Sequence, residues 1–275
     1  MAQLERIGAR IPAGRFPLHS RFRRYVNFLH AGPDGERVLG VTEEPDGASP
    51  YSLVVSGLAL PERGELVVHA DSVELGGTRL ARNPGQLYDP ALPVGGCRQE
   101  VFAGQLAALI RQLAAEAPPA SMAFVLEPEL RTGFAGGFAR ALLARLEEGV
   151  ALLEAGEWAA GARTLRGCGS GLTPTGDDFL AGVLYALRLD ELVTGTDRAR
   201  ERESVRENAL GGSVFSNTML DMAARGEPFA GLKRLLEKLA GEERLPLAKD
   251  TQRMLSLGHT SGADLLSGLA WTCGR

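Results

Sequence analysis

The chain has 275 residues, 44% of them hydrophobic and 23% charged, which is the composition of an ordinary globular protein. Its formal net charge of -4 argues against general nucleic-acid binding, because nonspecific affinity for a polyanion needs a basic surface. The three cysteines lack the spacing of a metal site, and the N-terminal region lacks a continuous apolar stretch. We therefore expect a cytoplasmic protein that does not cross a membrane.

The first third of the chain, residues 1–96, has the pattern of β structure. The first 24 residues are locally basic, which we interpret as a solvated face and, alternatively, as an anion-attracting arm. From Tyr25 to Tyr88, short apolar runs alternate with turn-forming residues, and their close spacing favours antiparallel pairing. The predicted strands are 26–29, 37–41, 52–55, 65–68 and 72–75. A stretch rich in Pro and Gly, 83–96, then predicts a link to the rest of the chain.

After Gly96 the hydrophobic period becomes helical, and Pro118 and Pro119 end the first predicted helix. Apolar residues then recur about every four positions from Phe134 to Leu153. Further helices are predicted at 158–165, from about 175, and at 213–225, 229–239, 247–257 and 261–271. The fold class is therefore predicted as α+β, with a small antiparallel β domain over residues 1–96 and a larger helical domain over 97–275.

One stretch, residues 166–182, combines several signals for binding. It has four glycines within ten residues, with Thr-Pro-Thr between the third and the fourth, and then two aspartates. Thr175 is the predicted N-cap of the next helix, and Asp178 is the acidic partner of a capping box. A helix start with free N–H groups, preceded by a flexible loop, favours a phosphate or carboxylate ligand. The stretch is not a Walker A motif, because it lacks the Gly-Lys-Ser/Thr ending.

The same pattern returns near the C-terminus and makes a two-copy repeat. Five positions of the first copy, Thr175, Gly176, Asp178, Leu180 and Gly182, align with Ser261, Gly262, Asp264, Leu266 and Gly268. Glycine inside a helix costs about 1 kcal/mol relative to alanine, so it usually marks a close approach of backbones. We therefore expect the helix containing Gly182 to cross the helix containing Gly268 at these two residues.

The two copies differ in their chemistry. Asp178 has its equivalent in Asp264, and capping explains both, whereas Asp177 is replaced by Ala263. Asp177 is therefore a candidate Mg²⁺ ligand, with a purely structural role as the equal alternative. The candidate ligand-binding residues are Gly169, Ser170, Gly171, Thr173, Thr175, Gly176, Asp177 and His259. For His259 a cap or packing role is the competing interpretation.

Four further polar residues, Asn27, Ser216, Asn217 and Thr218, are candidates to line the same pocket or to make local backbone hydrogen bonds. Cys168 is either a thiolate activated by the helix N-terminus or, more commonly for this pattern, a small buried residue. No histidine lies near it in sequence to complete a catalytic dyad.

The runs 169–182, 216–226 and 258–264 together resemble the AllH family of bacterial proteins, described as a subunit of oxamate carbamoyltransferase. The resemblance extends from about Tyr25 to the end of the chain and is specific in the glycine–aspartate motif. It implies a succinyl-CoA-ligase-like partner subunit and a third subunit in purine and allantoin catabolism. It also implies an anionic ligand such as carbamoyl phosphate, phosphate, oxalurate or oxamate. A second hypothesis stays open, namely a non-catalytic protein that scaffolds or regulates an enzyme complex.

Overall fold

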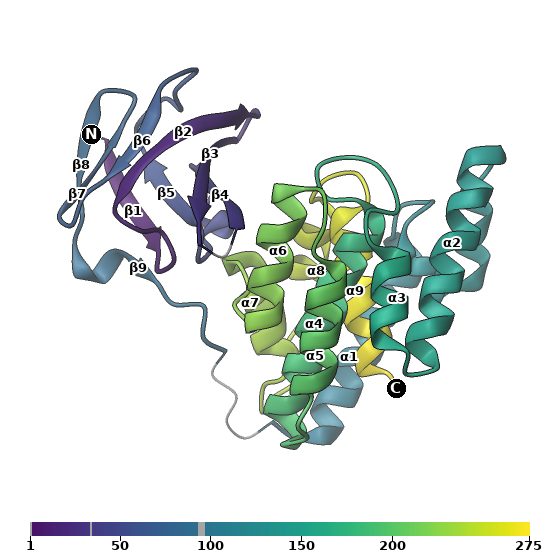
Figure 1. Cartoon of the computed structure of the whole chain (residues 1–275). Helices are drawn as coiled ribbons and strands as arrows, with labels where there is room; N and C mark the ends of the chain where they lie inside the picture. Colours follow the sequence, from purple (N-terminus) through teal and green to yellow (C-terminus); the bar gives the residue numbers. More distant parts are fainter. Residues whose placement is uncertain (1, 34, 93–96) are drawn as a thin grey trace. The chain divides into compact units, whose positions relative to one another are not determined.

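A computed structural model describes residues 2–33, 35–92 and 97–275 of the chain (Figure 1). The fold is α+β, as predicted, with a mostly antiparallel sheet in the N-terminal region followed by helices. The chain divides into two compact units, the first made of residues 1–91 and 227–233 and the second of residues 92–226 and 234–275. The predicted domain boundary at residue 96 lies outside the described residues.

The first unit contains a sheet that, over the described residues, has nine strands in the order β8-β7-β6-β2-β3-β4-β5-β1-β9. Their bounds are β1 Gln3–Gly8, β2 Gly14–Arg21, β3 Tyr25–Gly32, β4 Gly35–Thr42, β5 Ser52–Ser56, β6 Glu65–Val68, β7 Ser72–Leu75, β8 Thr78–Ala81 and β9 Leu87–Tyr88. The five predicted strands correspond to β3 to β7. Buried valines, leucines and Phe28 from these strands form the core of the unit.

Three of the basic N-terminal residues, Arg6, Arg15 and Arg21, lie in two strands, β1 and β2, that the sequence interpretation had not assigned. The arginines take the solvent-facing positions of the strands while residues such as Ile7 and Phe16 are buried. Arg15 on β2 forms an ion pair with Glu65 on β6, next to it in the sheet. The reading of a solvated basic face therefore holds, but this face belongs to a sheet, because side chains alternate between the two faces of a strand.

Antiparallel pairs predominate in the sheet, as predicted, but two neighbouring pairs are parallel. β4 pairs with β5 and β1 pairs with β9 in parallel orientation. A single turn of 3-10 helix, Pro45–Gly47, lies in the connection that leads back to the start of β5. The hydroxyl of Ser52 donates to the carbonyl oxygen of Gly47 at 2.8 Å and fixes the end of that connection.

The segment 227–233, far along the chain, belongs to the first unit. Glu227 accepts two hydrogen bonds of 2.5 Å from the guanidinium of Arg10. The hydroxyl of Tyr88 donates to the carbonyl oxygen of Pro228 at 2.8 Å, and Ala230 N–H donates to that of Ala48 at 2.8 Å. The side chain of Ala230 packs on a small cluster of buried residues. Sequence periodicity gives no sign of such a long-range insertion.

The second unit is helical and is built around two helices that are buried along most of their length, α4 and α9. The helices of the chain are α1 Gln99–Glu116, α2 Gly137–Glu154, α3 Trp158–Leu165, α4 Thr175–Thr194, α5 Ala199–Ala209, α6 Val214–Arg225, α7 Ala230–Leu239, α8 Ala248–Leu255 and α9 Ser261–Cys273. The first four residues of α7 fall in the first unit. Two 3-10 helices, η3 Met122–Val125 and η4 Pro128–Gly133, follow α1.

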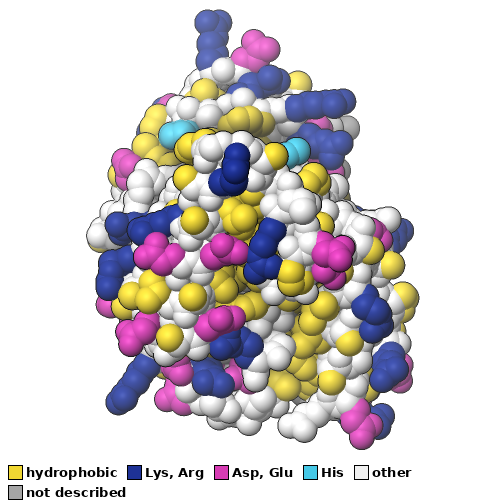
Figure 2. Space-filling model, turned by 90° about the vertical axis from the view of Figure 1, so that its right-hand side faces the viewer, with side chains coloured by type: hydrophobic (Ala, Val, Ile, Leu, Met, Phe, Trp, Pro, Cys, Tyr) yellow, Lys and Arg dark blue, Asp and Glu magenta, His cyan; other side chains and the backbone are white. Residues whose placement is uncertain are grey.

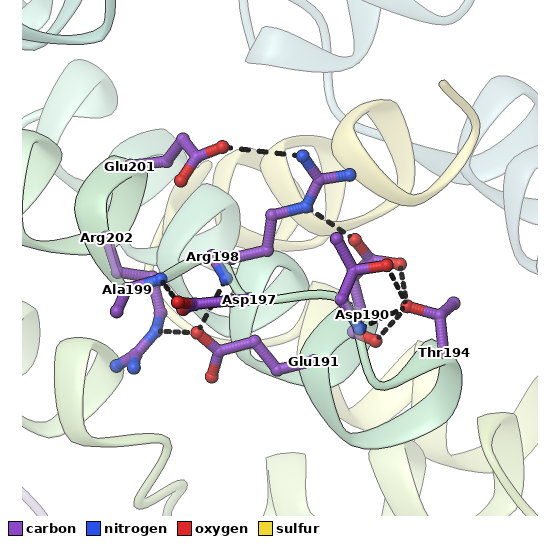
Figure 3. A network of polar contacts seen from close by, with 9 residues as sticks. Asp190, Glu191, Thr194, Asp197, Arg198, Ala199, Glu201 and Arg202 are labelled. Carbon is purple, nitrogen blue, oxygen red and sulfur yellow. Dashed lines mark hydrogen bonds and ion pairs between the residues drawn. The ribbon is translucent and has the colours of Figure 1, made fainter.

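Helix α5 was not predicted, because its sequence is dominated by charged residues and shows little apolar periodicity. A polar network fixes its start against the end of α4 (Figure 3). Glu191 accepts from the guanidinium of Arg188 at 2.8 Å and from that of Arg202 at 2.9 Å. Arg198 donates to Asp190 at 2.7 Å. Burial alone would raise the pKa of Glu191, but the hydrogen bonds from the two arginines outweigh it and hold the pKa below its ordinary value.

We expect Glu191→Gln to lower the free energy of unfolding by about 1–3 kcal/mol at neutral pH, because it leaves two arginines without their charged acceptor. A carboxyl with a lowered folded-state pKa stabilises the fold above its unfolded pKa and loses that effect as pH falls. The difference from the wild type in urea denaturation should therefore shrink from pH 7 to pH 4. Glu203→Gln, at an exposed i,i+3 pair with Arg206, is the control and should change stability little. Equal effects of both substitutions would contradict the assignment.

Candidate functional site

Helices α4 and α9 cross at the two glycines that the repeat singled out. A Cβ added to Gly182 would overlap the carbonyl oxygen of Leu265 and lie 3.0 Å from the Cα of Gly268. A Cβ on Gly268 would likewise overlap the carbonyl oxygen of Phe179. The predicted close crossing is therefore confirmed, and the glycines are required because no side chain fits between the two backbones.

The repeat extends to the way each of the two helices begins. Each copy consists of an eight-residue helix, a loop and a long buried helix, namely α3 before α4 and α8 before α9. A Cβ on Gly176 would overlap the carbonyl oxygen of Leu165 at the end of α3, and one on Gly262 would overlap that of Met254 near the end of α8. The glycine at the second position of each long helix therefore allows the start of that helix to pack directly against the end of the short helix before it.

The capping boxes predicted for both copies are absent. The helices begin one residue earlier than the predicted N-caps imply, so that Pro174 and Thr260 are the N-cap residues, and neither side chain makes a capping hydrogen bond. Asp178 accepts a hydrogen bond of 3.1 Å from the hydroxyl of Thr173 instead of reaching back to its own helix start. Asp264 accepts at 2.6 Å from the backbone N–H of Met122 in η3. The close crossing turns both carboxyl groups towards neighbouring elements, which satisfy them instead.

The two aspartates lie at the junction of the helix starts and are paired crosswise. The hydroxyl of Ser261, the first residue of α9, faces Asp178 of α4, and that of Thr175, the first residue of α4, faces Asp264 of α9. Both carboxyl groups are buried, with exposed fractions of 2% for Asp178 and 0% for Asp264. Burial raises the pKa of Asp264 to about 7 and that of Asp178 well above its ordinary value.

The loop that precedes α4, residues 166–174, makes a tight connection that depends on its glycines. Gly167, Gly169 and Gly171 have φ angles of 69°, 116° and 100°, in the region that favours glycine. The Gly167 N–H donates to Asp177 at 2.7 Å. Within the part of the chain that the structure describes, the N–H groups of Gly169, Ser170 and Gly171 have no hydrogen-bond acceptor. The loop therefore offers successive backbone donors at the surface.

The first turn of α4 is less open than the sequence suggested. The Gly176 N–H donates to the carbonyl oxygen of Cys168 at 2.8 Å, and those of Asp177 and Asp178 donate to that of Pro174 at 2.9 and 3.1 Å. A ligand would therefore meet the loop amides rather than the amides of the helix start. Thr175 and Gly176, both predicted as ligand-binding residues, are buried in the junction between α4 and its neighbours.

Asp177 is held by hydrogen-bond donors. It is 3% exposed, and besides Gly167 it is faced by the hydroxyl of Ser216 on α6. Burial raises its pKa, and the guanidinium of Arg166 acts in the opposite direction. The residue thus has a structural role, that of closing the loop onto α4, which the sequence did not reveal.

Asp177→Ala should therefore lower the free energy of unfolding by about 1–3 kcal/mol, in addition to any effect on ligand binding, because it removes the acceptor of the Gly167 N–H. Urea denaturation measures this loss.

Two arginines near the loop were not among the predicted site residues. Arg166 begins the loop and donates to the carbonyl oxygen of Leu210 at 3.1 Å. Arg145 on α2 acts on the thiol of Cys168. Arg166 was visible in the sequence as the residue directly before the glycines, whereas nothing in the sequence of α2 indicates that Arg145 comes near them.

Cys168 is not an activated thiolate. Burial raises the pKa of its thiol in spite of Arg145, and the thiol donates to the carbonyl oxygen of Thr164 at 3.1 Å. The effect of a helix N-terminus on a thiol requires that the sulfur face the helix start, and here it is turned to the end of α3. The commoner interpretation, a partly buried structural cysteine, describes this residue.

The loop before α9, residues 256–260, leads to Ser261, whose hydroxyl lies 3.4 Å from that of Thr173 in the glycine-rich loop. His259 is in this second loop and is exposed. The loop between α5 and α6 joins the same cluster, because the hydroxyl of Ser213 donates to the carbonyl oxygen of Leu172 at 2.6 Å. Leu172 itself is 46% exposed. The starts of α6 and α9 therefore both contact the glycine-rich loop.

The other polar candidates have local roles. Asn217 brackets Gly211 by accepting from its N–H at 2.9 Å and donating to its carbonyl oxygen at 3.1 Å. The Thr218 hydroxyl donates to the carbonyl oxygen of Val214 at 2.7 Å. Asn27, in the β unit, donates to the hydroxyl of Ser20 at 3.2 Å. These are the local hydrogen bonds that were the alternative to a binding role.

A pocket of about 180 Å³ lies between α2, α9 and the two 3-10 helices, on the α2 side of the helical unit. Figure 2 views the molecule from this side and shows hydrophobic side chains between acidic and basic ones. The charged groups at the pocket are paired, Arg131 with Glu147 at 2.7 Å and Glu154 with Arg275 at 3.2 Å. The pocket therefore lacks the free positive charge that an anionic ligand needs.

The described residues contain no group of three or more His, Cys, Asp or Glu side chains that could hold a metal ion. They also contain no helix that is both long enough and apolar enough to cross a bilayer. No curated protein and no solved structure gives a significant match to the chain. Residues 165–273, which include α4, α9 and the loops that precede them, match the family model of the oxamate carbamoyltransferase subunit AllH. The resemblance to the AllH family is thereby confirmed for this region of the chain.

Proposed function

We propose that the protein is a subunit of an oxamate carbamoyltransferase-like enzyme of allantoin catabolism, and that it binds an anionic small molecule at the loop 166–174. The observation that supports the ligand site is the run of unpaired N–H groups at Gly169, Ser170 and Gly171, inside the region that matches the family model. Successive backbone N–H groups in a glycine-rich turn form a concave seat for phosphate or carboxylate oxygens.

The charges around the loop suit such a ligand. Arg166 begins the loop and is exposed, and Arg145 lies near Cys168. Asp177 is turned inward and accepts a hydrogen bond from the Gly167 N–H. Its negative charge therefore does not occupy the place of a ligand at the N–H groups of Gly169, Ser170 and Gly171. Carbamoyl phosphate, phosphate, oxalurate and oxamate all carry the oxygen atoms that backbone N–H groups and a guanidinium bind well.

In this proposal the loop positions the ligand and stabilises negative charge that develops on its oxygens when the carbamoyl group is transferred. A Mg²⁺ ion could join the anion only if Asp177, the one carboxylate available to it here, turned away from its donors Gly167 and Ser216, because in the structure it points inward. Mg²⁺ is commonly held by one or two carboxylates together with phosphate oxygens and water. Asp177 is the residue that would contribute the carboxylate.

The partners that complete the enzyme are, in this proposal, a succinyl-CoA-ligase-like subunit and a third subunit. The alternative is that the chain scaffolds or regulates that complex without binding its substrate. Activity and ligand binding of the isolated chain, compared with the chain reconstituted with its partners, distinguish the two. Ligand binding that maps to the glycine-rich loop supports the first, and unaltered activity after substitution in the loop supports the second.

Calorimetric titration with phosphate, carbamoyl phosphate and oxamate, with and without Mg²⁺, tests the ligand site. We expect Arg166→Gln to weaken binding about tenfold or more, because it removes a charge-assisted hydrogen bond. Arg163→Gln is the matched control, since Arg163 is an exposed arginine on α3 whose partner is Asn208. Binding that is absent with all partner subunits present, or that is equal in the two variants, would refute the site.

A further inference from the structure

The α5–α6 connection, residues 210–213, contacts the glycine-rich loop at two points. The guanidinium of Arg166 donates to the carbonyl oxygen of Leu210 at 3.1 Å, and the hydroxyl of Ser213 donates to that of Leu172 at 2.6 Å. In the sequence of the loop, these two contacts flank the three N–H groups that have no acceptor within the described chain. The connection therefore holds the arginine and the loop N–H groups in one frame.

The side chain of Arg166 packs against Gly211 of this connection. A Cβ added to Gly211 would lie 2.7 Å from the Cδ of Arg166, 3.2 Å from its Cγ and 3.4 Å from its Nε. Gly211 is not among the glycines with a positive φ angle, so its backbone conformation is not what requires glycine. What the missing Cβ provides is room for the arginine side chain.

Asn217, in the first turn of α6, holds Gly211 by both of its backbone groups. The side-chain amide accepts from the Gly211 N–H at 2.9 Å and donates to the Gly211 carbonyl oxygen at 3.1 Å. Because an amide side chain offers a donor and an acceptor together, the two bonds fix both the position and the orientation of Gly211. An ionised aspartate accepts but cannot donate, so it would keep only one of them.

The charge of Arg166 is available to a ligand. Among the described residues Arg166 forms no ion pair, and the one hydrogen bond of its guanidinium goes to a neutral carbonyl oxygen. A guanidinium has several N–H donors, so most of them stay free for an oxyanion. A long side chain loses conformational freedom when it binds a ligand, and a guanidinium that is already held in place loses less of it.

We propose that Gly211 and Asn217 are positioning residues for Arg166. Gly211 leaves room for the arginine side chain, Asn217 fixes Gly211, and the guanidinium is thereby kept beside the loop N–H groups. The inference rests on the proposed function, in which Arg166 binds a phosphate or carboxylate group. It adds two residues that touch no ligand themselves and yet set its affinity.

Gly211→Ala is the test, with Gly212→Ala as its matched control, because a Cβ on Gly212 would meet nothing within 4 Å. Calorimetric titration uses inorganic phosphate and oxamate, with the partner subunits present. We expect Gly211→Ala to weaken binding by about three- to tenfold, because the guanidinium is displaced. Gly212→Ala should bind like the wild type. Both variants should melt near the wild-type temperature, since the displaced atoms belong to an exposed side chain.

A double substitution shows whether the effect passes through the arginine. In an Arg166→Ala background the atoms that a Cβ on Gly211 would overlap are absent, so Gly211→Ala should cause no further loss of affinity. An equal loss in both backgrounds would mean that Gly211 acts on the loop by another route, and this result would overturn the proposal.

Modification of Arg166 by phenylglyoxal, followed by mass spectrometry of the digest, measures the same positioning without a ligand. The held guanidinium of the wild type and of Gly212→Ala should react several-fold more slowly than that of Gly211→Ala or Asn217→Ala. Asn217→Asp, which keeps one of the two hydrogen bonds, should lie between. Arg140, an exposed arginine on α2, is the internal reference. A merely structural role of Asn217 would lower stability and leave the relative rate at Arg166 unchanged.

Equal affinities and equal modification rates in Gly211→Ala and Gly212→Ala would refute the positioning role, while the ligand site would stand if Arg166→Gln still weakens binding. A wild type that binds neither anion in the complete complex would refute the ligand site instead, and the modification rates would then decide alone whether Gly211 and Asn217 hold Arg166. If Asn217→Ala does not fold, the comparison of the two glycine variants remains, since both glycines are exposed.

Discussion

Gly182→Leu is expected to abolish stable folding of the helical unit or to reduce its free energy of unfolding by at least about 3 kcal/mol. A Cβ at this position would already overlap the carbonyl oxygen of Leu265 and lie 2.7 Å from the N atom of Leu269. Backbone atoms cannot move aside as the end of a side chain can, so α4 and α9 would have to separate. These two helices form the centre of the unit, and total stabilities of domains are commonly only about 5–15 kcal/mol.

Gly182→Ala makes the same test more specific. Alanine is favoured over glycine inside a helix by about 1 kcal/mol, so intrinsic propensity predicts stabilisation, whereas the crossing predicts a net loss. Gly137→Ala is the control, because Gly137 is also helical and a Cβ there would meet nothing within 4 Å. Thermal and urea denaturation should show opposite signs for the two variants. A stabilised Gly182→Ala would exclude the close crossing.

Gly262→Ala is expected to have the second largest effect, a loss of about 1–3 kcal/mol or more. The added Cβ would overlap the carbonyl oxygen of Met254 and lie 3.4 Å from the N atom of Leu255, so the start of α9 would be pushed away from α8. Gly176→Ala should behave in the same way, because its Cβ would overlap the carbonyl oxygen of Leu165 and lie 3.2 Å from the Cβ of Cys168.

The matched control for both is Gly212→Ala, since Gly212 precedes α6 and has open space around its Cα. Near-UV circular dichroism adds a structural measurement, because Trp271 on α9 lies 5.6 Å from the ring of Phe179 on α4. A displaced α9 should change the signal of this aromatic pair. Wild-type stability and an unchanged spectrum in Gly262→Ala would mean that the two copies of the repeat are not built alike.

Local patterns in the sequence determined the α+β class, the helices α3, α6, α7, α8 and α9, and the meeting of Gly182 with Gly268. Such features depend on hydrophobic period and on glycine at a position where a side chain is costly, and both can be read from neighbouring residues. Strands β1 and β2 were missed because each has few buried apolar residues, and the exposed positions between them carry arginines and other polar residues. Helix α5 was missed because ion pairs with the end of α4 stabilise it.

The functions of individual polar side chains were decided only by the tertiary structure. Capping explained Asp178 and Asp264 locally, but the crossing of α4 and α9 places each beside the start of the other helix, where burial becomes the dominant effect on its pKa. Asp177 had no structural role that the sequence of its own helix could show, because the group that it binds, the N–H of Gly167, lies at the other end of the loop. The sequence shows the spacing of residues within one helix or strand. The hydrogen-bond partners of a side chain and its burial, by contrast, depend on helices and loops from distant parts of the chain that pack against it.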